Sequence, residues 1–160
     1  MTAVEKRLYV RKIENGTVID HIPPGFALAV LKILGLTGKE GHVIAVVMNV
    51  ESKKFGKKDI VKIEGVELDV ETVNKIALIA PHATINIIRN YSVASKSRVK
   101  VPDIIKGIIR CINPNCITNK PSEPITSLFH TISRDPLKIR CHYCGVVMSR
   151  SDILRALVGE

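Results

Sequence analysis

The chain has 160 residues, of which 46% are hydrophobic and 24% charged, and its formal net charge is +9. This composition is that of a folded, globular chain and not of a disordered one. The longest apolar runs are too short to span a bilayer, and the N-terminus lacks a secretory signal. We therefore expect a cytoplasmic protein with reduced thiols and no membrane partner. The positive excess favours an anionic partner, but aromatic residues make up only 4% of the chain and offer few platforms for stacking nucleic-acid bases.

The first hundred residues predict strands and helices in the order βαββαβ. Pro24 suits the first turn of the first helix and Gly35 its C-terminal cap, while Asp69 can cap the N-terminus of the second helix. This order is typical of the ferredoxin-like fold, an α+β arrangement in which both helices cover one face of a sheet and leave the other face open. We expect strands over 7–22 (with a turn at 15–16), 42–50, 59–65 and 83–90, the last extended or followed by 91–95, and helices over 23–36 and 70–80.

Alternation along two of these strands places polar residues on the open face. Val61 and Ile63 share one side of their strand, and Lys62 lies on the other. In the same way Asn86 lies opposite its apolar neighbours. The two polar side chains therefore stand together on the open face, where they are either solvated or part of a ligand site.

The first helix is apolar nearly all round, because only Lys32 is charged within the stretch 26–34. A helix that covers one sheet needs a single apolar stripe, so the pattern predicts a second buried surface such as a subunit interface. The polar, basic stretch "SKSRVKVPD" at 95–103 then predicts a boundary between a domain over 1–100 and a small, β-rich C-terminal domain over 101–160.

The C-terminal part contains all four cysteines, with the spacing C-x(4)-C-x(24)-C-x(2)-C. Two close pairs joined by a long loop are typical of a structural metal site, and we expect zinc, one ion per chain, held by Cys111, Cys116, Cys141 and Cys144. Iron in a rubredoxin-like site is the chemical alternative, which the longer first spacing disfavours. The turn around Pro114 brings the first pair together, and Gly145 allows the second turn. Four thiolates leave no open position for water, so the site is not hydrolytic.

Several blocks of the sequence resemble one known family. The stretches "GTVIDHIPPG", "GKKDIVKIEG", "APHATINIIRNYSVASKSRVKVP", "CINPNC" and "CHYC", in this order, closely resemble the regulatory chain of aspartate carbamoyltransferase. The resemblance implies a non-catalytic subunit of an enzyme of pyrimidine biosynthesis. Its N-terminal domain would bind CTP and ATP at one allosteric site, its zinc domain would dock on the catalytic chain, and two regulatory chains would form a homodimer.

The resemblance also implies roles for individual residues of the nucleotide site. The base pocket would be lined by Val10, Arg11, Lys12 and Ile13, and its wall completed by Asn86, Ile88, Tyr91 and Val93. Asp20 and His21 would approach the ribose and phosphates, and Lys62 would contact sugar and base. Lys96 would hold the triphosphate, with a further phosphate contact from Lys58.

Two other functions compete with this reading. The metal site and the positive charge are also compatible with a zinc-ribbon protein that binds nucleic acid, which a salt-dependent band shift would reveal. A metal-dependent redox enzyme is the third possibility, and it would show the absorbance of iron. We favour the regulatory chain, which has no nucleic-acid partner.

Overall fold

The computed structural model describes residues 12–54 and 56–158. Its elements alternate between strands and helices in the first part of the chain and are mainly strands in the second. In chain order they are β1 (Gly16–Ile22), α1 (Ala27–Ile33), β2 (Ile44–Ser52), β3 (Gly56–Glu64), α2 (Val70–Ile79), β4 (Thr84–Arg89), β5 (Ser92–Arg98), β6 (Ile104–Lys106), the short 3-10 helix η1 (Ile117–Asn119), β7 (Leu128–Arg134), β8 (Leu137–Cys141), β9 (Val147–Ser149) and α3 (Arg150–Val158).

The first sheet has five antiparallel strands in the order β2-β3-β1-β4-β5. Its first four strands with α1 and α2 have the predicted ferredoxin-like topology, so the α+β fold class is confirmed, and β5 adds a fifth strand beside β4. Part of the expected strand over 7–14, up to position 11, lies outside the described residues. The described positions 12–15 are not in a strand. The strand begins at Gly16, where a Cβ atom would lie 2.1 Å from the carbonyl oxygen of Ile63.

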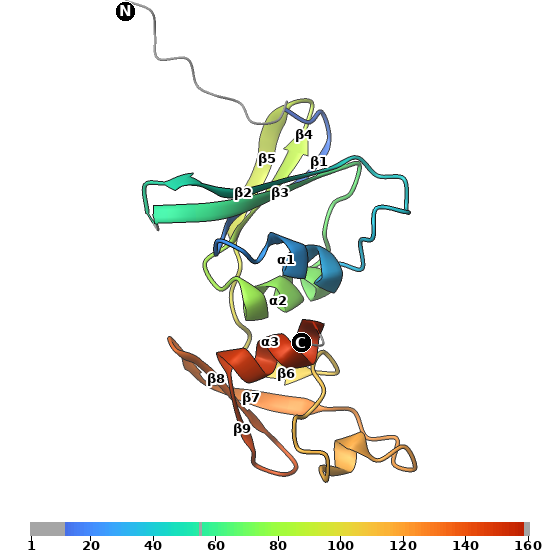
Figure 1. The fold of residues 1–160 in the computed structure, drawn as a ribbon. Helices are drawn as coiled ribbons and strands as arrows, with labels where there is room; N and C mark the ends of the chain where they lie inside the picture. The colour runs from blue at the N-terminus through green and yellow to red at the C-terminus, as the bar shows by residue number, and fades with distance from the viewer. Residues whose placement is uncertain (1–11, 55, 159–160) are drawn as a thin grey trace, which may run out of the picture.

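Both predicted helices are present and cover one face of this sheet (Figure 1). α1 is shorter than expected because Pro23 and Pro24 belong to a turn before it. It ends in a Schellman motif: the Gly35 N–H donates to the carbonyl of Lys32 and the next N–H, of Leu36, donates to that of Leu31, each at 3.0 Å. α2 starts as predicted, since the Asp69 Oδ1 accepts the Thr72 N–H at 2.8 Å.

The C-terminal part is a four-stranded sheet in the order β6-β7-β8-β9, followed by α3. Residues 95–98 of the expected boundary segment belong to β5 and pair with β4, so the strand runs further along the chain than expected. α3 was not predicted. It packs against both α1 and α2, so it lies between the two sheets (Figure 1).

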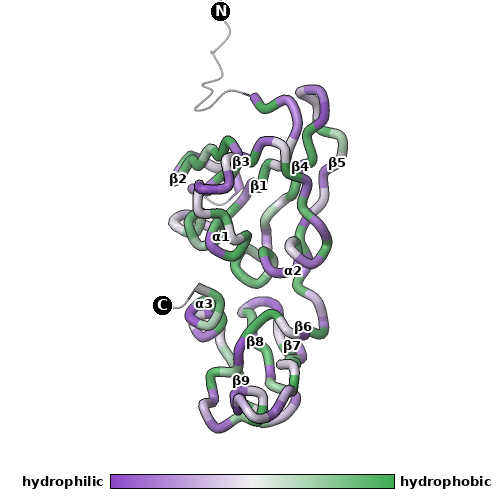
Figure 2. Tube along the Cα trace, turned by 90° about the vertical axis from the view of Figure 1, so that its right-hand side faces the viewer, coloured by the Kyte–Doolittle hydropathy of each residue, from purple (hydrophilic) through white to green (hydrophobic). Residues whose placement is uncertain are grey.

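The hydrophobic core is continuous through the molecule. It runs from the helix-facing side of the first sheet, through α2, to buried residues of the second sheet such as Phe129 and Ile139. Figure 2 shows the two sheets one above the other, with apolar segments in each. Within the described part of the chain, none of the helices has the length and apolar character needed to cross a membrane.

Candidate functional sites: an open-face cavity and a four-cysteine cluster

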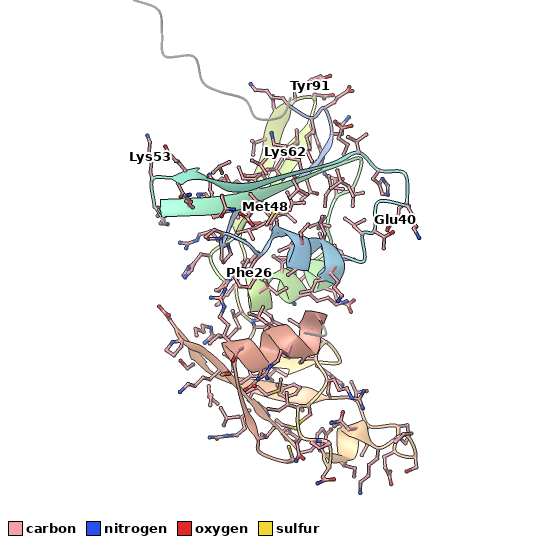
Figure 3. The ribbon with its side chains drawn as sticks, in the orientation of Figure 1. Phe26, Glu40, Met48, Lys53, Lys62 and Tyr91 are labelled. Carbon is pink, nitrogen blue, oxygen red and sulfur yellow. The ribbon has the colours of Figure 1, made fainter. Side chains whose placement is uncertain are left out.

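The face of the first sheet that points away from the helices carries a cavity of about 410 Å³. A row of facing residues crosses four strands beside it, because Val18 pairs with both Lys62 and Asn86, and Asn86 pairs with Lys96. Residues paired in this way point to the same face, so the expectation that Lys62 and Asn86 stand together on the open face is confirmed. Figure 3 shows Lys62 on this side of the sheet and Phe26 on the helix side.

Most of the residues predicted for a nucleotide site line this cavity. Those that do are Lys12, Ile13, Asp20, Lys62, Asn86, Ile88, Tyr91 and Val93. Val10 and Arg11 lie outside the described residues. His21, Lys58 and Lys96 do not line the cavity itself. The lining also includes Val18 and Ile60, which were not predicted, although their alternation with Lys62 and its partners would have found them.

A second hollow, of about 530 Å³, adjoins the first at Lys12 and Tyr91. Its wall includes Glu14 and Glu64 as well as His42. Because two carboxylates repel a polyanion, this hollow suits phosphates less well than the open-face cavity does.

Positive charge gathers around His21, beside this row. Lys58 Nζ lies 3.0 Å from the Asp20 Oδ1, which also accepts the His21 backbone N–H at 2.6 Å. Burial lowers the pKa of His21 below its usual 6.5, and the charges of Lys58, Lys96 and Lys54 lower it further, against the opposing effect of Asp20. The three lysines therefore act on one imidazole from β3, from β5 and from the loop between β2 and β3. Lys54 was not predicted here, and nothing in the sequence separates it from the neighbouring lysine.

The four cysteine sulfurs lie within 4.8 Å of one another. The Sγ atoms of Cys111 and Cys144 are 3.6 Å apart, and those of Cys116 and Cys141 are 3.7 Å apart. A tetrahedral ion with Zn–S bonds of about 2.3 Å needs sulfurs about 3.8 Å apart. The cluster therefore has the spacing that a tetrahedral four-thiolate ion requires.

Local hydrogen bonds shape both cysteine-bearing turns. In the first, the Asn119 side-chain amide donates to the carbonyls of Cys111 and Asn113 at 2.8 and 2.7 Å, and the Cys116 N–H donates to the Asn113 carbonyl at 3.0 Å. In the second, Gly145 has φ 78° and its N–H donates to the Cys141 carbonyl at 3.0 Å. Asn119 was missed by the sequence analysis, because its role depends on the fold of the intervening turn.

The surroundings of the thiols indicate why a cation belongs among them. Burial raises the pKa values of Cys111 and Cys141. Slight burial also opposes ionisation of Cys144, but the Val146 N–H, the Asn113 side chain and the neighbouring thiols lower its pKa to about 7. A bound dication would supply the charge that keeps all of them as thiolates. His130 and His142 face each other instead, with Nε2 and Nδ1 3.0 Å apart.

Comparison with known proteins covers both parts of the chain. The family described as "Aspartate carbamoyltransferase regulatory chain, allosteric domain" matches residues 8–100, and that described as "Aspartate carbamoyltransferase regulatory chain, metal binding domain" matches residues 103–154. Aspartate carbamoyltransferase regulatory chains with similar sequences occur in Korarchaeum cryptofilum (58% identical, covering 98% of this chain and 99% of the relative) and Hyperthermus butylicus (60% identical, 94% of each). Another occurs in Thermofilum pendens (59% identical, 97% of this chain and 98% of the relative).

Proposed function

Because the chain belongs to the family of aspartate carbamoyltransferase regulatory chains, we propose that its open-face cavity binds CTP and ATP in competition and that this binding controls the catalytic chains to which the metal-binding domain docks. The proposed nucleotide-binding domain spans 1–100 and the proposed zinc domain 101–160. The observation that carries the proposal is the row formed by Lys62, Val18, Asn86 and Lys96 beside the cavity.

The cavity combines apolar and polar side chains, as a nucleoside triphosphate requires. Apolar side chains such as Val18, Ile60 and Ile88 offer a surface for a flat base, while Lys62 and Asn86 offer hydrogen bonds to base and sugar. The phosphates would then extend toward Lys58, His21 and Lys96. By resemblance to the family, Val10 and Arg11, which lie outside the described residues, would complete the proposed base pocket.

We further propose that Cys111, Cys116, Cys141 and Cys144 hold one zinc ion per chain. The ion supplies folding free energy to a domain whose own core is small. Four thiolates fill its coordination shell, so this chain's cysteines anchor turns and take no part in turnover.

The proposed homodimer uses the outer side of α1 and the free edge of β2. Leu28 is 62% exposed on α1, and a groove of about 480 Å³ runs beside it, lined by Leu31, Leu36, Ile44 and Val46 among others. β2 lies at the edge of its sheet, where backbone groups can pair with a second copy. An exposed apolar patch next to an open strand edge is well suited to a subunit interface.

Reconstitution tests the whole proposal. The chain is mixed with its catalytic chain, the complex is isolated, and carbamoyl transfer to aspartate is measured with and without CTP and ATP. We expect a stable complex whose activity responds to both nucleotides, and no activity of the regulatory chain alone. A complex that forms but responds to neither nucleotide would contradict the effector assignment, and binding of DNA or RNA at physiological salt would instead favour the zinc-ribbon alternative. We place this assembly in the cytoplasm.

A further inference from the structure

Asp59 is a carboxylate with no solvent exposure, and none of the roles above uses it. Its Oδ2 accepts the backbone N–H groups of Gly25 and Ala27 at 2.8 and 3.0 Å, and its Oδ1 accepts that of Asn49 at 2.9 Å. A buried carboxylate is stable only when hydrogen bonds replace its water. Asp59 therefore fixes the chain where it enters α1 and, at the same time, the bulge in β2.

Asp59 also connects the two faces of the sheet. It directly follows Lys58, and alternation along β3 places Lys58 on the cavity face, where it pairs with Asp20, and Asp59 on the helix face. A shift of the β3 backbone at Lys58 must therefore move the carboxylate that holds the start of α1.

The start of α1 in turn touches α3. Phe26, which lies between the two residues held by Asp59, has the guanidinium carbon of Arg150 5.4 Å from its ring centroid. The same guanidinium donates through Nη2 to the carbonyl of Ile79, the last residue of α2, at 3.1 Å. Arg150 is the first residue of α3 and directly follows β9 of the second sheet. A single side chain thus joins the second sheet to both helices of the first.

We propose that Asp59 and Arg150 are positioning residues that couple the open-face cavity to the metal-binding domain, through the segment from Gly25 to Ala27. The physical link runs from the ion pair of Lys58 along β3 to the carboxylate of Asp59. It continues through the backbone on either side of Phe26, which that carboxylate holds, to the Phe26 ring and the guanidinium of Arg150. The use of this link in regulation rests on the proposed binding of nucleotides in the cavity. The mechanical coupling between the Lys58 end and the Arg150 end does not depend on nucleotide binding.

The first test needs no nucleotide. Amide hydrogen exchange is measured on the full metal-loaded chain and on its Asp59→Asn and Arg150→Ala variants, with Arg155→Ala as the matched control. Arg155 also lies on α3, but its side chain is 63% exposed and pairs with Asp152. We expect Asp59→Asn to speed exchange at the start of α1 and also in α3. Arg150→Ala should speed it in α3 and also at the start of α1, and Arg155→Ala in α3 alone.

The coupling is overturned if each variant changes amide exchange only in the elements next to the substituted residue. If Asp59→Asn changed only α1 and β2, or Arg150→Ala changed only α3, the contacts would be local packing. Should Asp59→Asn fail to fold, Arg150→Ala decides by the same criterion, because it removes the contact from the other end.

The second test uses the assembled enzyme. In Arg150→Ala we expect CTP and ATP affinities within about twofold of the unmodified chain, because the cavity is intact, while the nucleotide effect on activity falls about fivefold or more. Arg150→Lys, which keeps the charge without the planar guanidinium, should restore part of the response, and Arg155→Ala should keep all of it. A full response in Arg150→Ala would overturn the proposal. If the unmodified chain bound neither nucleotide, the proposed function would fail, and the exchange experiment would still decide the coupling.

Discussion

Two exposed lysines differ in their position relative to the cavity row. Lys96 faces Asn86 across β4 and β5 and contributes to the field at His21, whereas Lys53 lies exposed in the β2–β3 hairpin (Figure 3). A positive charge held by a sheet beside a cavity can bind phosphate at a fixed point. A charged side chain at the tip of a hairpin stays hydrated and can adopt many rotamers.

We therefore expect Lys96→Ala to weaken CTP and ATP binding. A charge-assisted contact contributes roughly 1.5–3 kcal/mol, which corresponds to a roughly 10- to 150-fold loss of affinity. Lys53→Ala, the control, should change affinity no more than about threefold. Titration calorimetry on the two variants measures both effects. Equal losses would indicate a diffuse basic patch in place of a defined site.

His21 provides a prediction about pH. Its pKa is lowered below 6.5 by burial and by nearby lysines, so the unfolded chain binds more protons than the folded one. The stabilising contribution of the neutral imidazole is therefore fully present above about pH 6.5 and is lost as pH falls toward the folded pKa. A bound triphosphate has the opposite effect, because its negative charge favours the imidazolium. Nucleotide affinity should accordingly rise as pH falls through this range.

Calorimetry in buffers of different ionisation enthalpy counts the protons taken up on binding. His21 has φ 58°, a conformation that asparagine also tolerates, so His21→Asn removes the titrating group with little strain on the backbone. The variant should take up fewer protons than the unmodified chain near pH 6. Identical uptake in the two proteins would assign the effect to the phosphates alone.

Among the elements, β1 depends most on a single small residue. A methyl group at position 16 would meet the backbone oxygen of Ile63 at 2.1 Å, and a backbone oxygen cannot turn aside as a side chain can. We expect Gly16→Ala to reduce the free energy of unfolding by roughly 2 kcal/mol or more. Gly38→Ala is the control, since position 38 also has a positive φ but open space around it, and only its backbone strain should be felt, at roughly 1–2 kcal/mol and without any contact cost. Denaturant unfolding compares the two, and equal losses would mean that the contact with Ile63 is relieved at little cost.

The elements also show which parts of the fold the sequence could predict. Helix ends could be predicted where a single residue determines them locally, as Asp69 does by capping α2 and Gly35 by ending α1. β5 was taken in part for a linker because its side chains are exposed along its whole length and lack the apolar alternation of a buried strand. α3 was missed although Ser149 and Asp152 form a capping pair, with the Ser149 N–H donating to Oδ2 at 2.9 Å.

The residues of the two sites also fall into those that the sequence could predict and those that it could not. The four cysteines could be grouped by spacing, and Lys62 and Asn86 by alternation, because both arguments use only distances along the chain. Asp59 and Asn119 could not be found, because their partners are backbone groups brought near by the tertiary fold. A short polar residue in a strand or turn does not reveal such partners in its sequence.

At the scale of the whole molecule, the two sheets share a core but depend on different stabilising forces. The first buries a large apolar face beneath two helices, whereas the second relies on the cysteine cluster at one end. Structural zinc supplies on the order of 10 kcal/mol to small domains. Removal of the ion should therefore unfold the second sheet and release the catalytic chain, while the first sheet keeps its structure.

Hydrogen exchange on chelator-treated chain measures this directly. Protection should be lost over residues 104–149 and retained in β1, β3 and β4, and addition of zinc should restore it. Undiminished protection of the second sheet after chelation would show that the cluster is dispensable for folding.

The strict alternation of β3 has a consequence for how this chain can change over evolutionary time. Lys58, Ile60 and Lys62 lie on the open face of the sheet, while Asp59, Val61 and Ile63, which separate them, lie on the helix face. A substitution in one set replaces no side chain of the other, so the open face can change without a new residue entering the interior. A single inserted or deleted residue exchanges the two sets over the rest of the strand, turning lysine inward and isoleucine outward. This segment can therefore diversify by replacement but not by changes in length.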